Sequence, residues 1–181
     1  THVVIDFSAP DLCGKVLNVC IQHNLPLVIG TTGFDNMQLQ QIESAAQKIP
    51  IILSPNMSLS VNVLFKVCKL VAARLTRAEV EITESHHRYK KDAPSGTAIR
   101  LGEAIADARG HDFKQVACYN RYGNQNTTRD PEEIGFSVIR GGDIVGCHSV
   151  EFIYDGEILN LTSEITNRGS FASGALHAAE F

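Results

Sequence analysis

The chain has 181 residues, of which 44% are apolar, and its formal net charge is −4 at pH 7. This length fits one domain or two small ones, the acidic balance argues against nucleic acid as a partner, and no apolar run is long enough to cross a bilayer. The five cysteines are scattered without a C-x-x-C pair, so we expect reduced thiols in a soluble, cytoplasmic protein without a signal peptide or a membrane partner.

Strands and helices alternate in the first third of the chain. Short apolar runs at 1–7, 27–29 and 51–53 are typical of buried strands in a parallel sheet. The first intervening helix should bury an apolar stripe made of Leu12, Val16, Val19 and Cys20. Asp35 and Gln38 form a capping-box pattern at the start of the second helix. This order predicts right-handed βαβ crossovers and a partial Rossmann-like parallel sheet.

Polar turns follow the second and third strands, at Gly30-Thr31-Thr32 and at Ser54-Pro55-Asn56-Met57. Ligands of such sheets bind outside the carboxyl ends of the strands. Taken alone, however, these residues could equally be plain turns. The glycine-rich phosphate loop expected after the first strand of a dinucleotide-binding domain does not occur. We therefore expect a fragment that lacks the N-terminal half of that domain and ends within a helix.

The remainder of the chain predicts an α+β domain. We expect a largely buried helix over 60–75 and four strands over 79–85, 135–139, 145–154 and 157–166. Asp155-Gly156 is a strong hairpin signal between the last two strands. Residues 119–133 are polar and irregular, with Gly123, Asn124 and Pro131 marking a surface loop. The prediction is a mixed sheet of about four strands.

The stretch from Glu84 to Ala98 carries the clearest chemical signal. Two histidines, an arginine and two lysines lie within six residues, and Ser95 is well placed to cap the helix that follows. The amides of Gly96 and Thr97 would lie in the first helical turn, which attracts anions. Imidazole supplies a proton near neutral pH. The pattern indicates recognition of a dicarboxylate or phosphate with acid catalysis, although a basic run can also be a solvated surface.

A metal site is not expected in this stretch. Adjacent residues on a strand point to opposite faces, so His86 and His87 could not easily bind one ion together. No cysteine or carboxylate stands at ligand spacing around them.

The string E-S-H-H-R-Y-K-K-D-A-P-S-G-T-A resembles the signature of the dihydrodipicolinate reductase family, E-x-H-H-x-x-K-x-D-A-P-S-G-T-A, at every fixed position. Further matches occur at 30–34, at 55–58 and at 140–146 with His148, in the family's order. The chain departs from the family at Ser60, where a glycine is usual. The resemblance covers nearly the whole chain.

The resemblance implies a reductase of lysine and diaminopimelate biosynthesis that transfers hydride from NADPH or NADH to 4-hydroxy-tetrahydrodipicolinate. It makes His86 the proton donor and Lys90 a second acid that neutralises developing negative charge. His87, Gly96 and Thr97 would bind a substrate carboxylate. The residues implied at the nicotinamide are Gly30, Thr31, Thr32, Ser54, Pro55, Asn56 and Met57. The family assembles as a homotetramer.

With this resemblance we divide the chain into a partial dinucleotide-binding domain over 1–57, a substrate-binding and oligomerisation domain over 58–168, and a helix over 169–181 that returns toward the first domain. The expected fragment would be inactive alone. Two alternatives stay open: another two-domain dehydrogenase acting on an amino acid, and a non-catalytic dicarboxylate-binding module.

Overall fold

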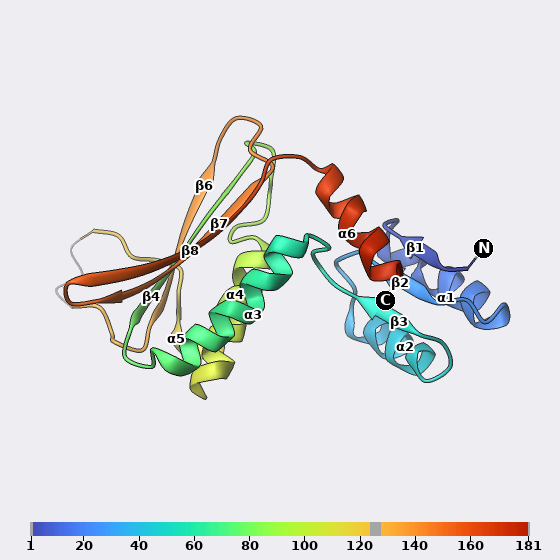
Figure 1. The fold of residues 1–181 in the computed structure, drawn as a ribbon, viewed down its shortest axis with the longest axis horizontal. Coiled ribbons are helices and arrows are strands. Elements are labelled where there is room, and N and C mark those ends of the chain that lie inside the picture. Colours follow the sequence, from blue (N-terminus) through green and yellow to red (C-terminus); the bar gives the residue numbers. More distant parts are fainter. Residues whose placement is uncertain (1, 124–127, 181) are drawn as a thin grey trace. The chain divides into compact units, whose positions relative to one another are not determined.

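The structure is a computed structural model that describes residues 2–123 and 128–180. The chain forms two compact units (Figure 1). Unit 1 contains the chain up to Leu59 and again from Gly169 onward, and unit 2 contains Ser60–Arg168. Within the described residues, no helix is both long and apolar enough to span a membrane.

Unit 1 is built on a parallel sheet of three strands in the order β1 (Val4–Asp6), β2 (Leu27–Ile29) and β3 (Ile51–Leu53). A 3₁₀ turn (Pro10–Leu12) and α1 (Cys13–Gln22) connect the first two strands, and α2 (Asn36–Ala46) connects the next two. The pairing aligns Val28 with Ile5 on one side and with Ile52 on the other. The predicted parallel sheet is confirmed.

The sheet of unit 1 contributes to two apolar cores, one with α1 and α2 and one with the last helix of the chain. One core joins α1 and α2 to the sheet and contains Cys13, Leu17, Cys20, Leu27, Ile29, Ile42, Ala45 and Ile49. A second core joins Val28 and Met57 to Ala175 of α6 (Gly169–Glu180). A Cβ on Gly174 would collide with the carbonyl oxygen of Met57. Glycine at that position therefore allows α6 to approach the backbone closely.

The predicted apolar stripe of α1 is confirmed for Cys20, which is buried, and for Val16, which packs against the core, but it is wrong for Leu12 and Val19. Leu12 and Val19 are 42% and 52% exposed, whereas Cys13, Leu17 and Cys20 are buried. The reason is the 3₁₀ turn before the helix: the α-helix begins at Cys13, and positions three or four residues apart from there face the sheet.

The capping box at the start of α2 is confirmed. The Gln38 amide donates to Asp35 Oδ1 at 2.8 Å, and the Asp35 amide donates to Gln38 Oε1 at 3.0 Å. Two otherwise unpaired backbone donors are satisfied in this way.

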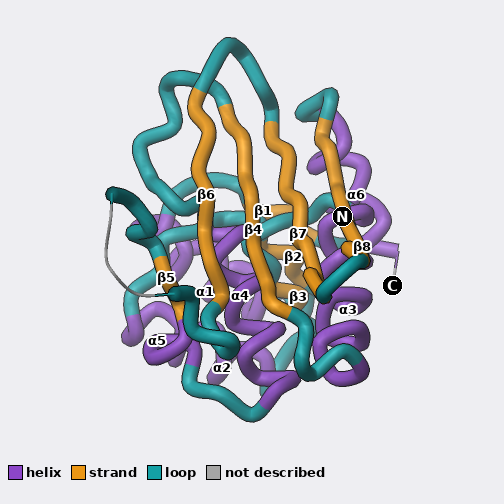
Figure 2. Tube along the Cα trace, turned by 90° about the vertical axis from the view of Figure 1, so that its left-hand side faces the viewer, coloured by secondary structure: helices purple, strands orange, loops and turns teal. Residues whose placement is uncertain are grey.

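Unit 2 contains a mixed sheet of five strands in the order β5-β6-β4-β7-β8 (Figure 2). The strands are β4 (Glu79–His86), β5 (Ala117–Cys118), β6 (Ile134–Arg140), β7 (Gly146–Tyr154) and β8 (Glu157–Ile165). The central strand β4 pairs parallel with β6 and antiparallel with β7. The predicted hairpin turn is confirmed: β7 pairs antiparallel with β8, and Gly156 in the turn between them has a φ of 85°. Only β5 was not predicted.

Three helices of unit 2, α3 (Leu59–Arg74), α4 (Gly96–Arg109) and the short α5 (Phe113–Val116), lie on one side of this sheet (Figure 1). Val80, Ile82, Leu101, Ile105 and Phe152 are fully buried between the helices and the sheet. The prediction that α3 is apolar on most sides and largely buried is wrong. Val63 and Leu70 are 59% and 61% exposed, because only one face of α3 reaches the sheet.

The polar segment between β5 and β6 is irregular, as predicted, where the structure describes it. Asn124 of that prediction lies outside the described residues. Arg129 attaches the segment to β4, since its Nε donates to Glu81 Oε1 at 3.1 Å and its Nη2 donates to the Val80 carbonyl at 2.9 Å.

Candidate active site

The helix-facing side of β4 changes from apolar to charged toward the carboxyl end of the strand. Val80 and Ile82 are fully buried, and the next two positions on that face are Glu84 and His86, which are 1% and 9% exposed. A buried carboxylate is costly unless charged or polar groups bind it.

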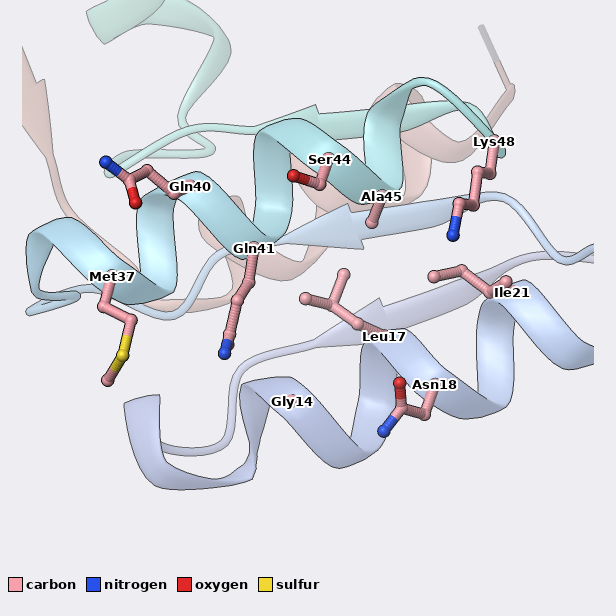
Figure 3. A pocket seen from close by; sticks show the side chains of 10 residues that line it. All are labelled: Gly14, Leu17, Asn18, Ile21, Met37, Gln40, Gln41, Ser44, Ala45 and Lys48. Carbon is pink, nitrogen blue, oxygen red and sulfur yellow. The ribbon is translucent and has the colours of Figure 1, made fainter.

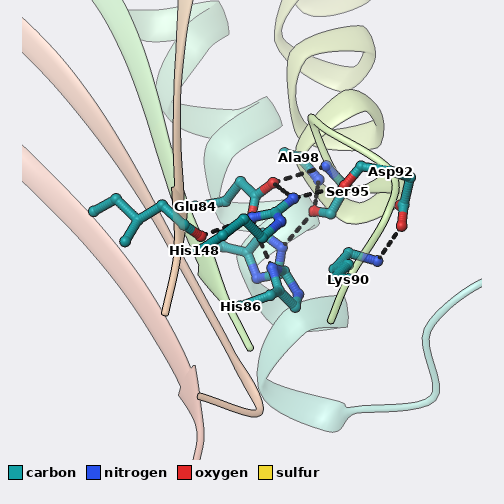
Figure 4. Close-up of polar contacts among 9 residues, drawn as sticks. Glu84, His86, Lys90, Asp92, Ser95, Ala98 and His148 are labelled. Carbon is teal, nitrogen blue, oxygen red and sulfur yellow. Dashed lines mark hydrogen bonds and ion pairs between the residues drawn. The ribbon is translucent and has the colours of Figure 1, made fainter. Parts of the chain in front are cut away.

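Glu84 receives four hydrogen bonds from three directions (Figure 4). His86 Nδ1 lies 2.5 Å from Oε2, and the Ser95 amide donates to Oε1 at 2.9 Å. Arg140, at the end of β6, donates to both oxygens at 2.8 Å. Burial acts to raise the pKa of Glu84, but hydrogen bonds from His86, Arg140 and Ser95 lower that pKa to about 2. The carboxylate is therefore ionised at neutral pH.

Ser95 forms the N-cap of α4, as predicted. Its Oγ accepts from the Ala98 amide at 3.3 Å, and its carbonyl accepts from the Ile99 amide at 3.0 Å. These two bonds use the backbone N–H groups of Ala98 and Ile99, which follow Gly96 and Thr97 in the first turn. Gly96 is exposed, and a Cβ on it would meet no atom of the described residues within 4 Å. The start of α4 is thus open at Gly96.

His148 of β7 lies behind this cap and is only 2% exposed. Its Nε2 shares a hydrogen bond of 3.0 Å with Ser95 Oγ, and its ring meets the His86 ring edge to face at 5.1 Å (Figure 4). Burial, with a smaller contribution from His86, lowers the pKa of His148 to about 4. His148 is therefore neutral at physiological pH.

Lys90 joins the same cluster through the loop between β4 and α4. Its Nζ lies 2.9 Å from Asp92 Oδ1, and the Asp92 carbonyl accepts from Arg140 Nη2 at 2.7 Å. His87 is half-buried, and its Nδ1 has no hydrogen-bond partner in the part of the chain that the structure describes. The structure thus places His86 and Lys90 on the same side of the start of α4 (Figure 4). Of the other predicted residues, His87 follows His86 in the chain, and Gly96 and Thr97 follow Ser95.

The predicted nucleotide-side residues lie in unit 1, where two turns follow the adjacent strands β2 and β3. The Gly30 amide donates to the Asp6 carbonyl at 2.9 Å, and the Ser54 amide donates to the Ile29 carbonyl at 3.1 Å. Thr32 and Pro55 are exposed, and Thr31 is buried with its Oγ1 3.4 Å from Asp6 Oδ2.

Gly30 and Met57 have specific packing roles in these turns. A Cβ on Gly30 would collide with the ring of Phe7, which is itself 51% exposed. Glycine therefore leaves room for an exposed aromatic ring at this edge. Met57 is buried in the core with Ala175, and its carbonyl packs against Gly174, so its place in this turn is one of packing. Ser54 Oγ donates to the Asn56 carbonyl at 2.8 Å, which fixes the second turn.

A separate groove opens between α1 and α2 (Figure 3). Its lining includes Leu17, Gln41 and Lys48, and it contains none of the predicted site residues. The groove shows no convergent charged cluster of the kind around Glu84.

Sequence reasoning assigned no role to Glu84, Arg140 or His148. One signal could have pointed to Glu84: it lies two residues before His86, on the face of an alternating strand that is otherwise apolar. A carboxylate on that face requires a cationic partner. Arg140 and His148 lie in stretches that match the family, but their positions beside Glu84 depend on the pairing of β6 and β7 with β4.

The fold and the site together define a class of α/β protein. Its parallel sheet has polar turns at the carboxyl edge, where nucleotides bind in such sheets, and its second unit holds an imidazole beside an open, cationic helix N-terminus. The chain belongs to the dihydrodipicolinate reductase family. Residues 1–57 match the family described as "Dihydrodipicolinate reductase, N-terminus", and residues 60–181 match "Dihydrodipicolinate reductase, C-terminus". The predicted family membership is confirmed.

Individual relatives support the same assignment. The chain is 49% identical to 4-hydroxy-tetrahydrodipicolinate reductase of Magnetococcus marinus, over 99% of this chain and 67% of that protein. It is 48% identical to the protein of the same name from Nitrosomonas europaea, over 100% of this chain and 68% of the relative. Its fold resembles dipicolinate-bound dihydrodipicolinate reductase from Paenisporosarcina sp. TG-14, with 30% identity and a TM-score of 0.76 over 98% of this chain and 67% of that one.

Proposed function

We propose that this protein reduces 4-hydroxy-tetrahydrodipicolinate to tetrahydrodipicolinate in lysine and diaminopimelate biosynthesis, with NADPH or NADH as reductant. The observation that carries the proposal is that Glu84 binds both His86 and the Ser95 amide at the start of α4, while Lys90 is paired with Asp92 in the loop before that helix. An acid and an anion-binding helix terminus at one place suit a substrate that carries carboxylates and must gain a proton.

The residues of unit 2 divide the work on the substrate. His86 would donate the proton, and Lys90 would neutralise the negative charge that develops as the hydride arrives. His87 and the amides of Gly96 and Thr97 would hold a carboxylate at the helix terminus, where the helix dipole favours anions. Asp92 keeps Lys90 at the site through their contact of 2.9 Å.

The residues of unit 1 fit a pyridine nucleotide. The exposed Thr32 and Pro55 follow adjacent parallel strands, and the exposed Phe7 ring packs over Gly30 beside them. An aromatic ring and polar turns at a carboxyl edge suit a ligand with a flat ring and polar substituents. The residues that would hold the cofactor are Gly30, Thr31, Thr32, Ser54, Pro55, Asn56 and Met57. The bound nucleotide would supply the hydride.

Calorimetry with pyridine-2,6-dicarboxylate, a planar mimic of the substrate, tests the substrate half of the proposal. Lys90→Ala should weaken binding by about 1.5–3 kcal/mol, roughly 10–150-fold, because a charge-assisted hydrogen bond is lost. Lys91→Ala is the matched control, since Lys91 is its exposed neighbour and should leave the affinity nearly unchanged. Equal affinity of both variants and the wild type at low salt would rule out the anion site.

Turnover tests the reductase itself. The protein in its full natural length should oxidise NADPH or NADH only when 4-hydroxy-tetrahydrodipicolinate is present. Dicarboxylate binding without nucleotide oxidation would instead favour the non-catalytic binding module.

We further propose that the protein acts in the cytoplasm as a homotetramer. The sheet face of unit 2 opposite the helices carries an exposed polar row, in which Ser149 Oγ donates to Asn160 at 2.8 Å and shares a bond of 3.0 Å with Thr162. A sheet face without helices is a natural surface for a symmetry mate. Light scattering at micromolar concentration should give the mass of four chains, and a monomer mass would contradict the proposal.

The free state of all five cysteines suits a reducing compartment, which supports the proposed cytoplasmic location.

A further inference from the structure

We propose that Glu84 is a positioning residue that holds His86 in its Nδ1–H tautomer and ties it to the first turn of α4, so that Nε2 is the atom that delivers the proton. The tautomer part stands on the hydrogen bonds of the ionised Glu84 and not on the proposed function. Its consequence for catalysis rests on the proposed function.

The tautomer follows from the hydrogen bonds of the carboxylate. An ionised carboxylate can only accept, and its two oxygens already receive Arg140 and the Ser95 amide. The contact of 2.5 Å between Glu84 Oε2 and His86 Nδ1 therefore requires a proton on Nδ1. Neutral imidazole carries one N–H, which leaves Nε2 as the nitrogen that gains and releases the second proton.

Arg140 keeps this arrangement in a single orientation. Its two donors reach both oxygens of Glu84 at 2.8 Å, and such a bidentate pair fixes the plane of the carboxylate. Arg140 Nη2 also binds the Asp92 carbonyl at 2.7 Å, which attaches the loop before α4 to the same guanidinium. His86 thus lies against a carboxylate whose orientation is fixed from β6.

The same carboxylate positions the helix terminus. Glu84 Oε1 accepts from the amide of Ser95, whose side chain caps α4. Only one side chain therefore separates the proton donor from the turn in which a substrate carboxylate would bind. Because one buried carboxylate binds both groups, the acid and the substrate site should keep their alignment.

The surroundings of Nε2 fit its proposed role. Nε2 faces Gly146, where an added Cβ would lie only 3.1 Å away. Glu84 and His148 contact the ring directly, and Arg140 binds the same carboxylate as His86. Of these, His148 is neutral at physiological pH and places no further positive charge against a protonated His86.

Nitrogen-15 NMR of histidine-labelled protein tests the tautomer directly. In the wild type at a pH where His86 is neutral, its signals should show a protonated Nδ1 and an unprotonated Nε2. Comparison with His86→Gln assigns these signals among the seven histidines. A wild-type His86 in the Nε2–H form would overturn the proposal, and this measurement does not depend on how any Glu84 variant folds.

Glu84→Gln then tests the cause. The new amide can still accept from Ser95 with its oxygen, and its nitrogen then replaces the oxygen that faces His86 and Arg140. This nitrogen can only donate, so it loses the Arg140 bond, Nδ1 should lose its proton, and the Nε2–H tautomer should appear. In the full-length protein we expect kcat to fall about 10²-fold, between typical losses for outer partners of imidazole and for the orienting carboxylate of a catalytic triad. KM should change much less.

The matched control is Glu103→Gln, because Glu103 is an exposed carboxylate of α4 that pairs with Arg100 at 3.7 Å on the surface. It should change neither the tautomer nor kcat. A Glu84→Gln variant with the wild-type tautomer and wild-type kcat would overturn the inference. A wild type that binds dicarboxylate but never turns over would refute the reductase proposal, and the NMR result would still decide the tautomer.

Discussion

Replacement of His86 by glutamine should lower kcat by roughly 10²–10⁴-fold, the usual contribution of a general acid. Glutamine keeps a polar side chain of similar length but cannot donate a titrating proton. Because Glu84 and Arg140 hold one another through two bonds of 2.8 Å, they should stay in place when the imidazole is removed. The substrate site at the start of α4 should therefore remain formed, and KM should change little.

Steady-state kinetics of the full-length protein separate this role from simple recognition. His23→Gln provides the control, since His23 is an exposed residue at the end of α1 in unit 1. His87→Gln is the informative neighbour: it should raise KM more than it lowers kcat, because His87 is proposed to bind a carboxylate. A His86 variant that loses only affinity would move His86 from proton transfer to substrate recognition.

Local signals predicted those elements whose boundaries are set by local chemistry. The strands β2 and β3 begin and end where expected, because apolar runs are bounded by proline and by polar turns. The start of α4 follows from Ser95, whose side chain supplies the cap. The exposure of Leu12 and Val19 was missed because a 3₁₀ turn precedes α1, and β5 was missed because two residues show no periodicity.

The candidate site was predictable only where it is continuous in sequence. His86 and Lys90 stand in one string, so residue type and family signature are sufficient to identify them. The site needs side chains from two other strands: Arg140, which binds Glu84, lies opposite His86 in the parallel pair, and His148, which binds Ser95, lies opposite Glu84 in the antiparallel pair. A shift of one residue in either register would turn those side chains to the other face of the sheet. Register therefore decides the site, and the sequence alone does not reveal it.

The buried His148 should make unit 2 sensitive to mild acid. Burial lowers the pKa of His148 from 6.5 to about 4 in the folded state. Above pH 6.5 the residue is neutral in both the folded and the unfolded state and adds no pH dependence. As the pH falls from 6.5 to 4, the unfolded chain takes up the proton first, and each pH unit removes up to about 1.4 kcal/mol from the free energy of unfolding. The total expected loss is about 3 kcal/mol.

Glu84 contributes in a different and lower window. Its pKa is lowered from 4.5 to about 2, so the stability it provides is complete above pH 4.5 and is lost only as the pH falls toward 2. A loss of unfolding free energy between pH 6.5 and 4.5 can therefore be attributed to His148 rather than to Glu84.

His148→Gln tests this assignment, because glutamine can still bind Ser95 Oγ but cannot take up a proton. Between pH 6.5 and 4.5 the free energy of unfolding should fall much less in this variant than in the wild type, even if the variant is less stable at neutral pH. Urea titrations followed by tyrosine fluorescence suit the measurement: the chain has no tryptophan, and its four tyrosines all lie in Ser60–Arg168, so the signal reports on unit 2 alone. His111→Gln, at a partly exposed histidine of the same unit, is the control and should keep the wild-type slope. An unchanged slope in His148→Gln would show that another group carries the acid sensitivity and that His148 is not the buried neutral histidine described above.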